Sequence, residues 1–107
     1  MTQNSKSSEL AGAVSKVQHF IKKIAVAEAQ LAECQKKLAC EEGMLQASLA
    51  TAETSKNMEY LEVSRNAFRA GIKVWSLSKA AYQNDIDTFN SEINAIYKRH
   101  PRARLDN

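Results

Sequence analysis

The sequence predicts an all-α fold, an antiparallel two-helix coiled-coil hairpin. The composition suits long helices, because the 107 residues include only three Gly and one Pro, with 44% apolar and 25% charged side chains. Apolar residues recur every three or four positions along two long runs, the spacing of a helix that packs along a seam. The two runs are out of phase with each other, so a turn must separate them within this one small domain.

The first helix is expected over residues 8–52, after a polar, flexible N-terminus of residues 1–7. When the heptad positions are lettered a to g, the d slots are all apolar: Leu10, Val17, Ile24, Leu31, Leu38, Leu45 and Ala52. The a slots are apolar at both ends of the run and polar in its middle, at Glu28, Gln35 and Glu42. This pattern predicts a helix packed along a seam that is interrupted by polar side chains.

The turn is expected at residues 53–57. Leu49 and Met58 both occupy a slots but lie nine positions apart, one heptad plus two residues. Continuous coiled coils absorb insertions of three or four residues, and an insertion of two does not fit that pattern. The chain is therefore expected to fold back between the two runs.

The second helix is expected over residues 58–99. Its a and d slots are Met58, Leu61, Arg65, Phe68, Ile72, Trp75, Lys79, Tyr82, Ile86, Phe89, Ile93 and Ile96. We interpret Trp75 as a core residue. The helix must end before Pro101, because the residue that precedes a proline disfavours the α conformation. Residues 100–107 are expected to form a basic, flexible tail.

The polar seam positions favour the hairpin over a parallel dimer. Folding at residues 53–57 brings Glu28 within a turn of Lys79, and Glu42 within a turn of Arg65. A parallel homodimer would instead stack like charges on one another. Two interpretations stay open: these residues specify the register of the hairpin, or they make a metastable seam that rearranges when a partner binds.

The second helix carries another apolar stripe on the side opposite the seam. Its members occupy the c and f slots: Tyr60, Val63, Ala67, Ala70, Val74, Leu77 and Ala81. A lone hairpin can bury only one of the two faces, and monomers rarely expose such a patch. Gly71 and the alanines would let another helix approach closely. We therefore expect the hairpin to assemble into a larger helical bundle, by self-association or with a partner helix.

No catalytic, cofactor-binding or metal-binding motif is present, so we expect no enzyme, no cofactor and no small-molecule substrate. His19 and His100 have no Cys or carboxylate at metal-ligand spacing. Cys34 and Cys40 would lie ~9 Å apart on one helix, beyond the ~7 Å that a disulfide spans. Together with a polar start that lacks a signal-peptide pattern, these thiols predict a cytoplasmic protein. No apolar run is long enough for a transmembrane helix.

We therefore expect a non-enzymatic protein–protein interaction module, in the manner of an adaptor, an inhibitor or a small chaperone. It would act through the second apolar face and bind itself, as a dimer or higher oligomer, or a helical segment of another protein, or both. The alternative is a dimeric helical-hairpin protein that binds nucleic acid through its basic C-terminal half. The candidate contacts are Arg65, Arg69, Lys73, Lys98, Arg99, Arg102 and Arg104. Membrane binding is not expected, because the apolar stripes are long and the charges are mixed.

Overall fold

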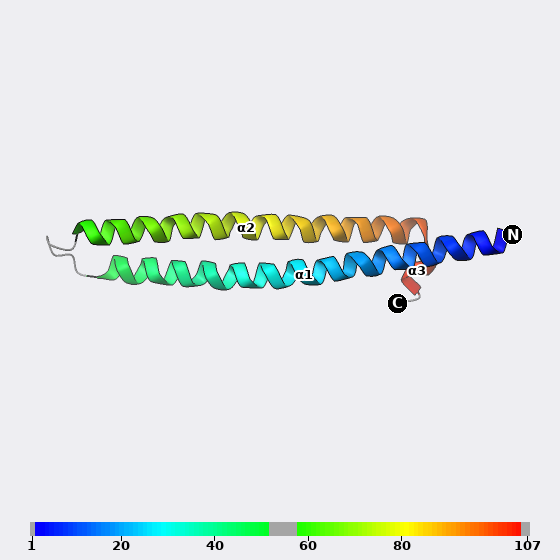
Figure 1. Ribbon diagram of the computed structural model, residues 1–107, viewed down its shortest axis with the longest axis horizontal. Helices are drawn as coiled ribbons and strands as arrows, with labels where there is room; N and C mark the ends of the chain where they lie inside the picture. The colour runs from blue at the N-terminus through cyan, green and yellow to red at the C-terminus, as the bar shows by residue number, and fades with distance from the viewer. Residues whose placement is uncertain (1, 52–57, 106–107) are drawn as a thin grey trace. The chain divides into compact units, whose positions relative to one another are not determined.

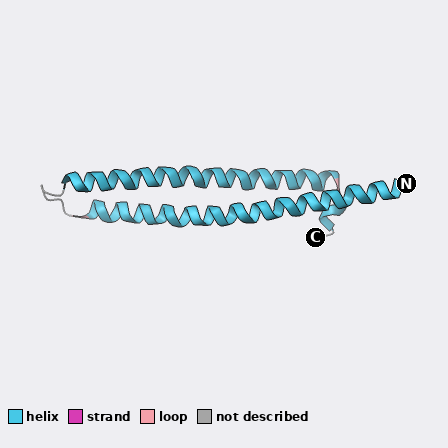
Figure 2. Cartoon of the chain, viewed as in Figure 1, coloured by secondary structure: helices cyan, strands magenta, loops and turns pink. Residues whose placement is uncertain are grey.

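The computed structural model describes residues 2–51 and 58–105, and this part of the chain is all-helical, without strands (Figures 1 and 2). Two long helices, α1 (Thr2–Ala50) and α2 (Met58–Arg99), are followed by the short α3 (Pro101–Leu105). The all-α prediction is therefore confirmed for the described residues.

The helix boundaries differ from expectation mainly at the ends of the chain. α2 occupies the same residues as the expected second helix. α1 begins at Thr2 rather than at residue 8 and ends at Ala50. No Gly or Pro occurs between Thr2 and Ala11, so nothing in that stretch breaks a helix. The expected turn at residues 53–57 lies outside the described residues.

α3 stands where a flexible tail was expected. Pro101 begins the helix, a position where its fixed φ and missing N–H cost nothing. The amide of His100 donates to the carbonyl of Ile96 over 2.8 Å, and the amide of Ala103 donates to the carbonyl of His100 over 3.0 Å. The Ala103 side chain is 0% exposed and belongs to an apolar cluster. Packing of Ala103 therefore holds this segment in place. Its basic composition had led to the expectation of a flexible tail.

The chain divides into two compact units, and each is described by itself. Unit 1 joins α1 up to Ala29 to the part of the chain from Gln83 onward, which includes α3. Unit 2 spans Gln30–Tyr82. In each unit a segment of α1 packs against an antiparallel segment of α2.

Unit 1 contains a continuous apolar core. Ala13 and Val17 of α1 are buried against Ile93 and Ile96 of α2, and Ala103 of α3 closes the cluster. The partly buried side chains packed around it are Leu10, Val14, Phe20, Ile24 and Tyr97. Burial of this apolar surface stabilises the pairing of the two helices and fixes α3 against them.

The contacts of unit 2 are more polar. The Lys37 ammonium lies 4.5 Å from the centroid of the Trp75 ring, which is half-buried between the helices. Further towards the end of α1, the Arg65 side chain reaches Ser48. Numbers that rise along α1 meet numbers that fall along α2, so the two segments run antiparallel.

The face that α1 turns to α2 is rotated from the expected one. The d slots from Leu10 to Leu45 are buried or half-buried, as expected. The second buried row, however, follows the g slots rather than the a slots: Ala13, Phe20, Ala27, Cys34, Glu41 and Ser48. Most of these side chains are small, so they let the helices approach closely, while Glu28, Gln35 and Glu42 remain in water.

The predicted pairing of seam charges is therefore wrong. Glu28 and Lys79 are both exposed, so neither lies in a seam. Glu42 is exposed as well, and Arg65 binds Ser48, six residues further along α1. The a slots Ile21 and Leu49 are also exposed, because the rotation of α1 turns that row outward.

Candidate functional site

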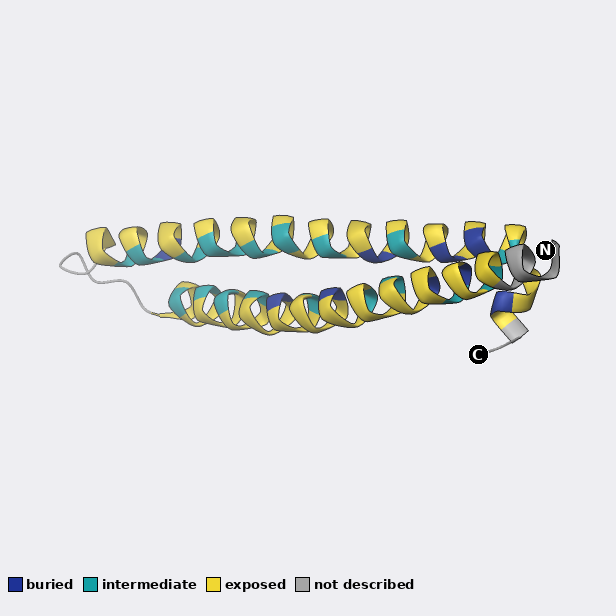
Figure 3. Ribbon diagram, turned by 45° about the vertical axis from the view of Figure 1, so that its right-hand side comes forward, coloured by how far each residue is buried: buried dark blue, intermediate teal, exposed yellow. Residues whose placement is uncertain are grey.

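The candidate site is the side of α2 that faces away from α1 in unit 2. We call it the outer face, and its members are Tyr60, Val63, Ala67, Ala70, Val74, Leu77 and Ala81. All seven are exposed, and the four large side chains remain 73%, 65%, 55% and 64% accessible at Tyr60, Val63, Val74 and Leu77. Figure 3 shows this side of α2 in yellow, the colour of exposed residues. The structure thus leaves the outer face uncovered in this chain.

Apolar side chains are distributed unequally between the two units. In the described part of the chain, the buried apolar residues of unit 1 are Ala13, Val17, Ala27, Ile86, Ile93, Ile96 and Ala103, whereas unit 2 contributes Cys34. The exposed large apolar residues of unit 2 are Met44, Leu49, Met58, Tyr60, Val63, Val74 and Leu77, whereas unit 1 contributes Ile21 and Val26. Unit 2 therefore exposes more large apolar side chains to water than unit 1 does.

Gly71 does not belong to the outer face. It is half-buried, and a Cβ atom placed on it would lie 2.9 Å from the Glu41 carboxyl carbon of α1. The absence of a side chain therefore makes room for Glu41. The expectation that Gly71 lets a foreign helix approach is wrong, and the small residues at the middle of the outer face are Ala67 and Ala70.

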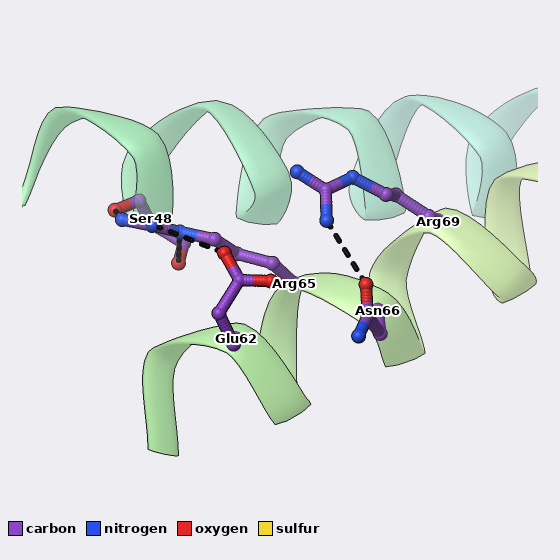
Figure 4. A network of polar contacts seen from close by, with 5 residues as sticks. All are labelled: Ser48, Glu62, Arg65, Asn66 and Arg69. Carbon is purple, nitrogen blue, oxygen red and sulfur yellow. Dashed lines mark hydrogen bonds and ion pairs between the residues drawn. The ribbon is translucent and has the colours of Figure 1, made fainter. Parts of the chain in front are cut away.

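Arg65 holds the end of α1 against α2 (Figure 4). Its side chain is 4% exposed. Nη2 donates to the Ser48 carbonyl over 2.7 Å, and Nε donates to the Ser48 hydroxyl over 3.1 Å. Nη1 lies 3.9 Å from the Glu62 carboxylate. The last turn of α1 has no basic residue of its own, so Arg65 supplies the positive charge that the exposed carbonyls of a helix C-terminus favour.

Burial removes Arg65 from the candidate nucleic-acid contacts. Arg69 and Lys73 are exposed, and Nη1 of Arg69 donates to the Asn66 side-chain oxygen over 3.0 Å. The remaining basic candidates belong to unit 1 and are also exposed: Lys98, Arg99, Arg102 and Arg104. The structure thus separates the predicted basic set between the two units and withdraws one member from solvent.

Residues of the metal-ligand types are dispersed over the described part of the chain. No group of three or more His, Cys, Asp or Glu side chains gathers at metal-binding distance in residues 2–51 and 58–105. Both cysteines are free thiols, Cys34 buried and Cys40 exposed. A shallow groove of about 450 Å³ in unit 1 is lined by both acidic and basic side chains, including Glu9, Lys16 and Arg99. None of the described helices has a stretch apolar enough to cross a bilayer.

Comparison of the chain with protein families, with curated proteins and with solved structures finds no match. The site therefore stands on its own residues. Two residues that hold the surrounding structure together were not identified from the sequence. Ser48 accepts hydrogen bonds from Arg65, and Ala103 packs α3 into the apolar cluster of unit 1. The signal for Ser48 was the row of small residues in the g slots of α1, and the signal for Ala103 was Pro101 at a helix start.

Proposed function

We propose that the chain is a non-enzymatic protein–protein interaction module, a two-helix coiled-coil hairpin that joins a larger helical bundle through the outer face of α2. The observation that supports this is the stripe of four large apolar side chains, Tyr60, Val63, Val74 and Leu77, each more than half exposed. Contact between water and apolar surface costs ~25 cal/mol per Å². A helix that covers the stripe removes this contact, so the free energy of the complex is lower than that of the separate partners.

The shape of the outer face suits a helix as its ligand. The residues repeat every three and four positions, so they form one straight row along α2. Ala67 and Ala70 at its middle leave space for a neighbouring backbone, and the larger residues at both ends supply apolar contact area. The partner is a second copy of the chain, a helical segment of another protein, or both, and the module acts as an adaptor, inhibitor or small chaperone. Free thiols at Cys34 and Cys40 support a reducing compartment, the cytoplasm.

Nucleic-acid binding is the second candidate. It is supported by the ordered position of α3, which holds Arg102 and Arg104 exposed beside the buried Ala103. Basic side chains fixed on a scaffold contact phosphates with less loss of entropy than a flexible tail. It ranks below protein binding because Arg65 is buried and bonded to Ser48.

Replacing Val63 and Leu77 with Glu tests the proposed function. Two carboxylates on the outer face add charge that a docked helix would have to desolvate, so binding should fall by at least tenfold. The helix content should not change, because both side chains are exposed. Oligomer mass by light scattering, capture of cellular proteins by the tagged chain, and far-UV circular dichroism are measured on the same preparations.

The control variant carries Ser76→Glu and Asn90→Glu, which place the same two charges at exposed positions of α2 outside the outer face. We expect this variant to keep the oligomer mass and the captured proteins of the wild type. If V63E/L77E keeps both as well, the outer face is not a binding surface and the proposal fails.

A further inference from the structure

Six of the seven outer-face residues, all but Ala81 at its end, follow an order of large and small side chains that reads the same in both directions. From Tyr60 the order is two large side chains, two alanines and two large side chains: Tyr60, Val63, Ala67, Ala70, Val74 and Leu77. All six are exposed on one helix of unit 2. A surface with this symmetry is complementary to its own copy turned end to end.

We propose that the occupant of the outer face is the outer face of a second copy of this chain, with the two α2 helices antiparallel. This rests on the proposed function and names its partner. In an antiparallel helix pair the slots of one row lie level with slots of the other row. Ala67 then lies level with Ala70 of the second copy, Val63 with its Val74, and Tyr60 with its Leu77. The alanines meet at the two-fold axis, where the backbones are closest.

The charges along α2 match in the same register. α2 begins with the acidic residues Glu59 and Glu62, and no acid follows from Ser64 to Gln83. In the register set by the apolar residues, Glu59 lies within about two residues of the level of Lys79 of the second copy, and Glu62 of its Lys73. Lys79 occupies an a slot on the other side of α2, so this is a match of charge along the helix and not a set of direct contacts. All four side chains are exposed. The acidic start of each helix therefore runs beside the basic stretch of the other, and the two helix dipoles oppose.

One like-charge contact opposes this arrangement, since Arg69 lies level with its own copy. It sits on the flank of α2, where its guanidinium is exposed and bonded to Asn66. Salt and water screen such a pair strongly. A parallel pair would instead align the whole acidic start with itself and the basic stretch with itself.

The area of the outer face is sufficient for a weak dimer. The row from Tyr60 to Ala81 is ~32 Å long at 1.5 Å per residue, and a helix contact is about 10 Å wide. Two such strips, of about 320 Å² each, bury roughly 640 Å² in total, which lies in the range of weak, transient interfaces and below that of standard-size ones. We therefore expect a dimer that dissociates in the micromolar range, with its apolar surface covered at about 100 μM protein.

Spin labels on the full-length chain distinguish the antiparallel dimer from its alternatives. In a background of Cys34→Ala and Cys40→Ser, a single label is attached through Asn66→Cys in one protein and through Ala80→Cys in another. Both positions are exposed and lie on the same flank of α2. At 1.5 Å per residue, the antiparallel register places the two labels of a dimer roughly 10–15 Å apart at position 66 and roughly 35 Å apart at position 80.

Equal distances between the two spin labels at position 66 and at position 80 would overturn the antiparallel arrangement. This holds even if V63E/L77E abolished the dimer, a result that would support the outer face as the contact. A mass of 11.9 kDa with no dipolar coupling at about 100 μM would overturn the second copy as the occupant. In that case, capture that V63E/L77E abolishes would still support the proposed function through a different protein, so the two failures are distinguishable.

Discussion

The Val17→Asp variant is expected to lose most of its helical structure at 25 °C. Val17 is 0% exposed and lies in the apolar cluster of unit 1, among Ala13, Ile93 and Ile96. A carboxylate there must be buried without a partner or take up a proton, and either outcome costs about 4 kcal/mol or more. That is comparable to the whole stability of a small domain, ~5–15 kcal/mol. Circular dichroism and urea unfolding measure the loss.

The matched control is Val63→Asp, which makes the same substitution on the outer face, where Val63 is 65% exposed. At dilute, monomeric concentration it should shift the free energy of unfolding by less than about 1 kcal/mol. Val17→Ala gives a milder test, with an expected loss of about 2 kcal/mol from the cavity it leaves. Equal effects at positions 17 and 63 would mean that unit 1 is not the stabilising core.

The Arg65→Ala variant is expected to show the second largest effect. The substitution removes two hydrogen bonds to Ser48 and the apolar stem of a buried side chain. Hydrogen bonds to charged groups contribute a net ~1.5–3 kcal/mol each after the exchange of bonds with water. We expect a net loss of about 3 kcal/mol in unfolding free energy, measured by urea denaturation in dilute solution.

Two further variants separate the causes of that loss. Arg65→Lys keeps the charge but loses the planar fork that reaches both Ser48 oxygens, so about half of the effect should remain. Arg69→Ala removes an exposed arginine of the same helix and should change stability by less than about 0.5 kcal/mol. If Arg65→Ala behaves like Arg69→Ala, the contact with Ser48 does not stabilise unit 2.

Much of the fold followed from helical periodicity alone. The d slots of α1 and most a and d slots of α2 are buried or half-buried, because a strict three-and-four spacing leaves few other faces for apolar side chains. The bounds of α2 also matched, since its start was set by the phase change and its end by Pro101.

The rotation of α1 could not be predicted from apolar spacing. The apolar side chains of Ile21 and Leu49 favoured the a slots as the row of α1 that faces α2. In the structure the g slots face α2 instead, because their small residues let the helices approach closely and because the carboxylates of the a slots then stay hydrated. Those two effects depend on the distance between the helices, which a sequence pattern does not state. The error carried over to the expected charge pairs and to the expected role of Gly71.

The outer face was identified from the sequence because two apolar rows on one helix exceed what a hairpin can bury. The structure adds its context. Unit 1 holds most of the buried apolar residues, and unit 2, which carries the outer face, is joined by more polar contacts such as that of Arg65. This division of roles predicts that unit 2 gains stability when its outer face is covered.

Hydrogen exchange of the wild-type chain at several concentrations tests this division most directly. We expect amides of residues 60–81 to exchange more slowly as the concentration rises from about 1 to 100 μM, the range over which the proposed dimer would form. Amides of residues 86–97 should be well protected throughout and should not respond. In V63E/L77E the concentration dependence should disappear. Exchange in residues 60–81 that is the same at every concentration, and as slow as in residues 86–97, would contradict an outer face that awaits a partner.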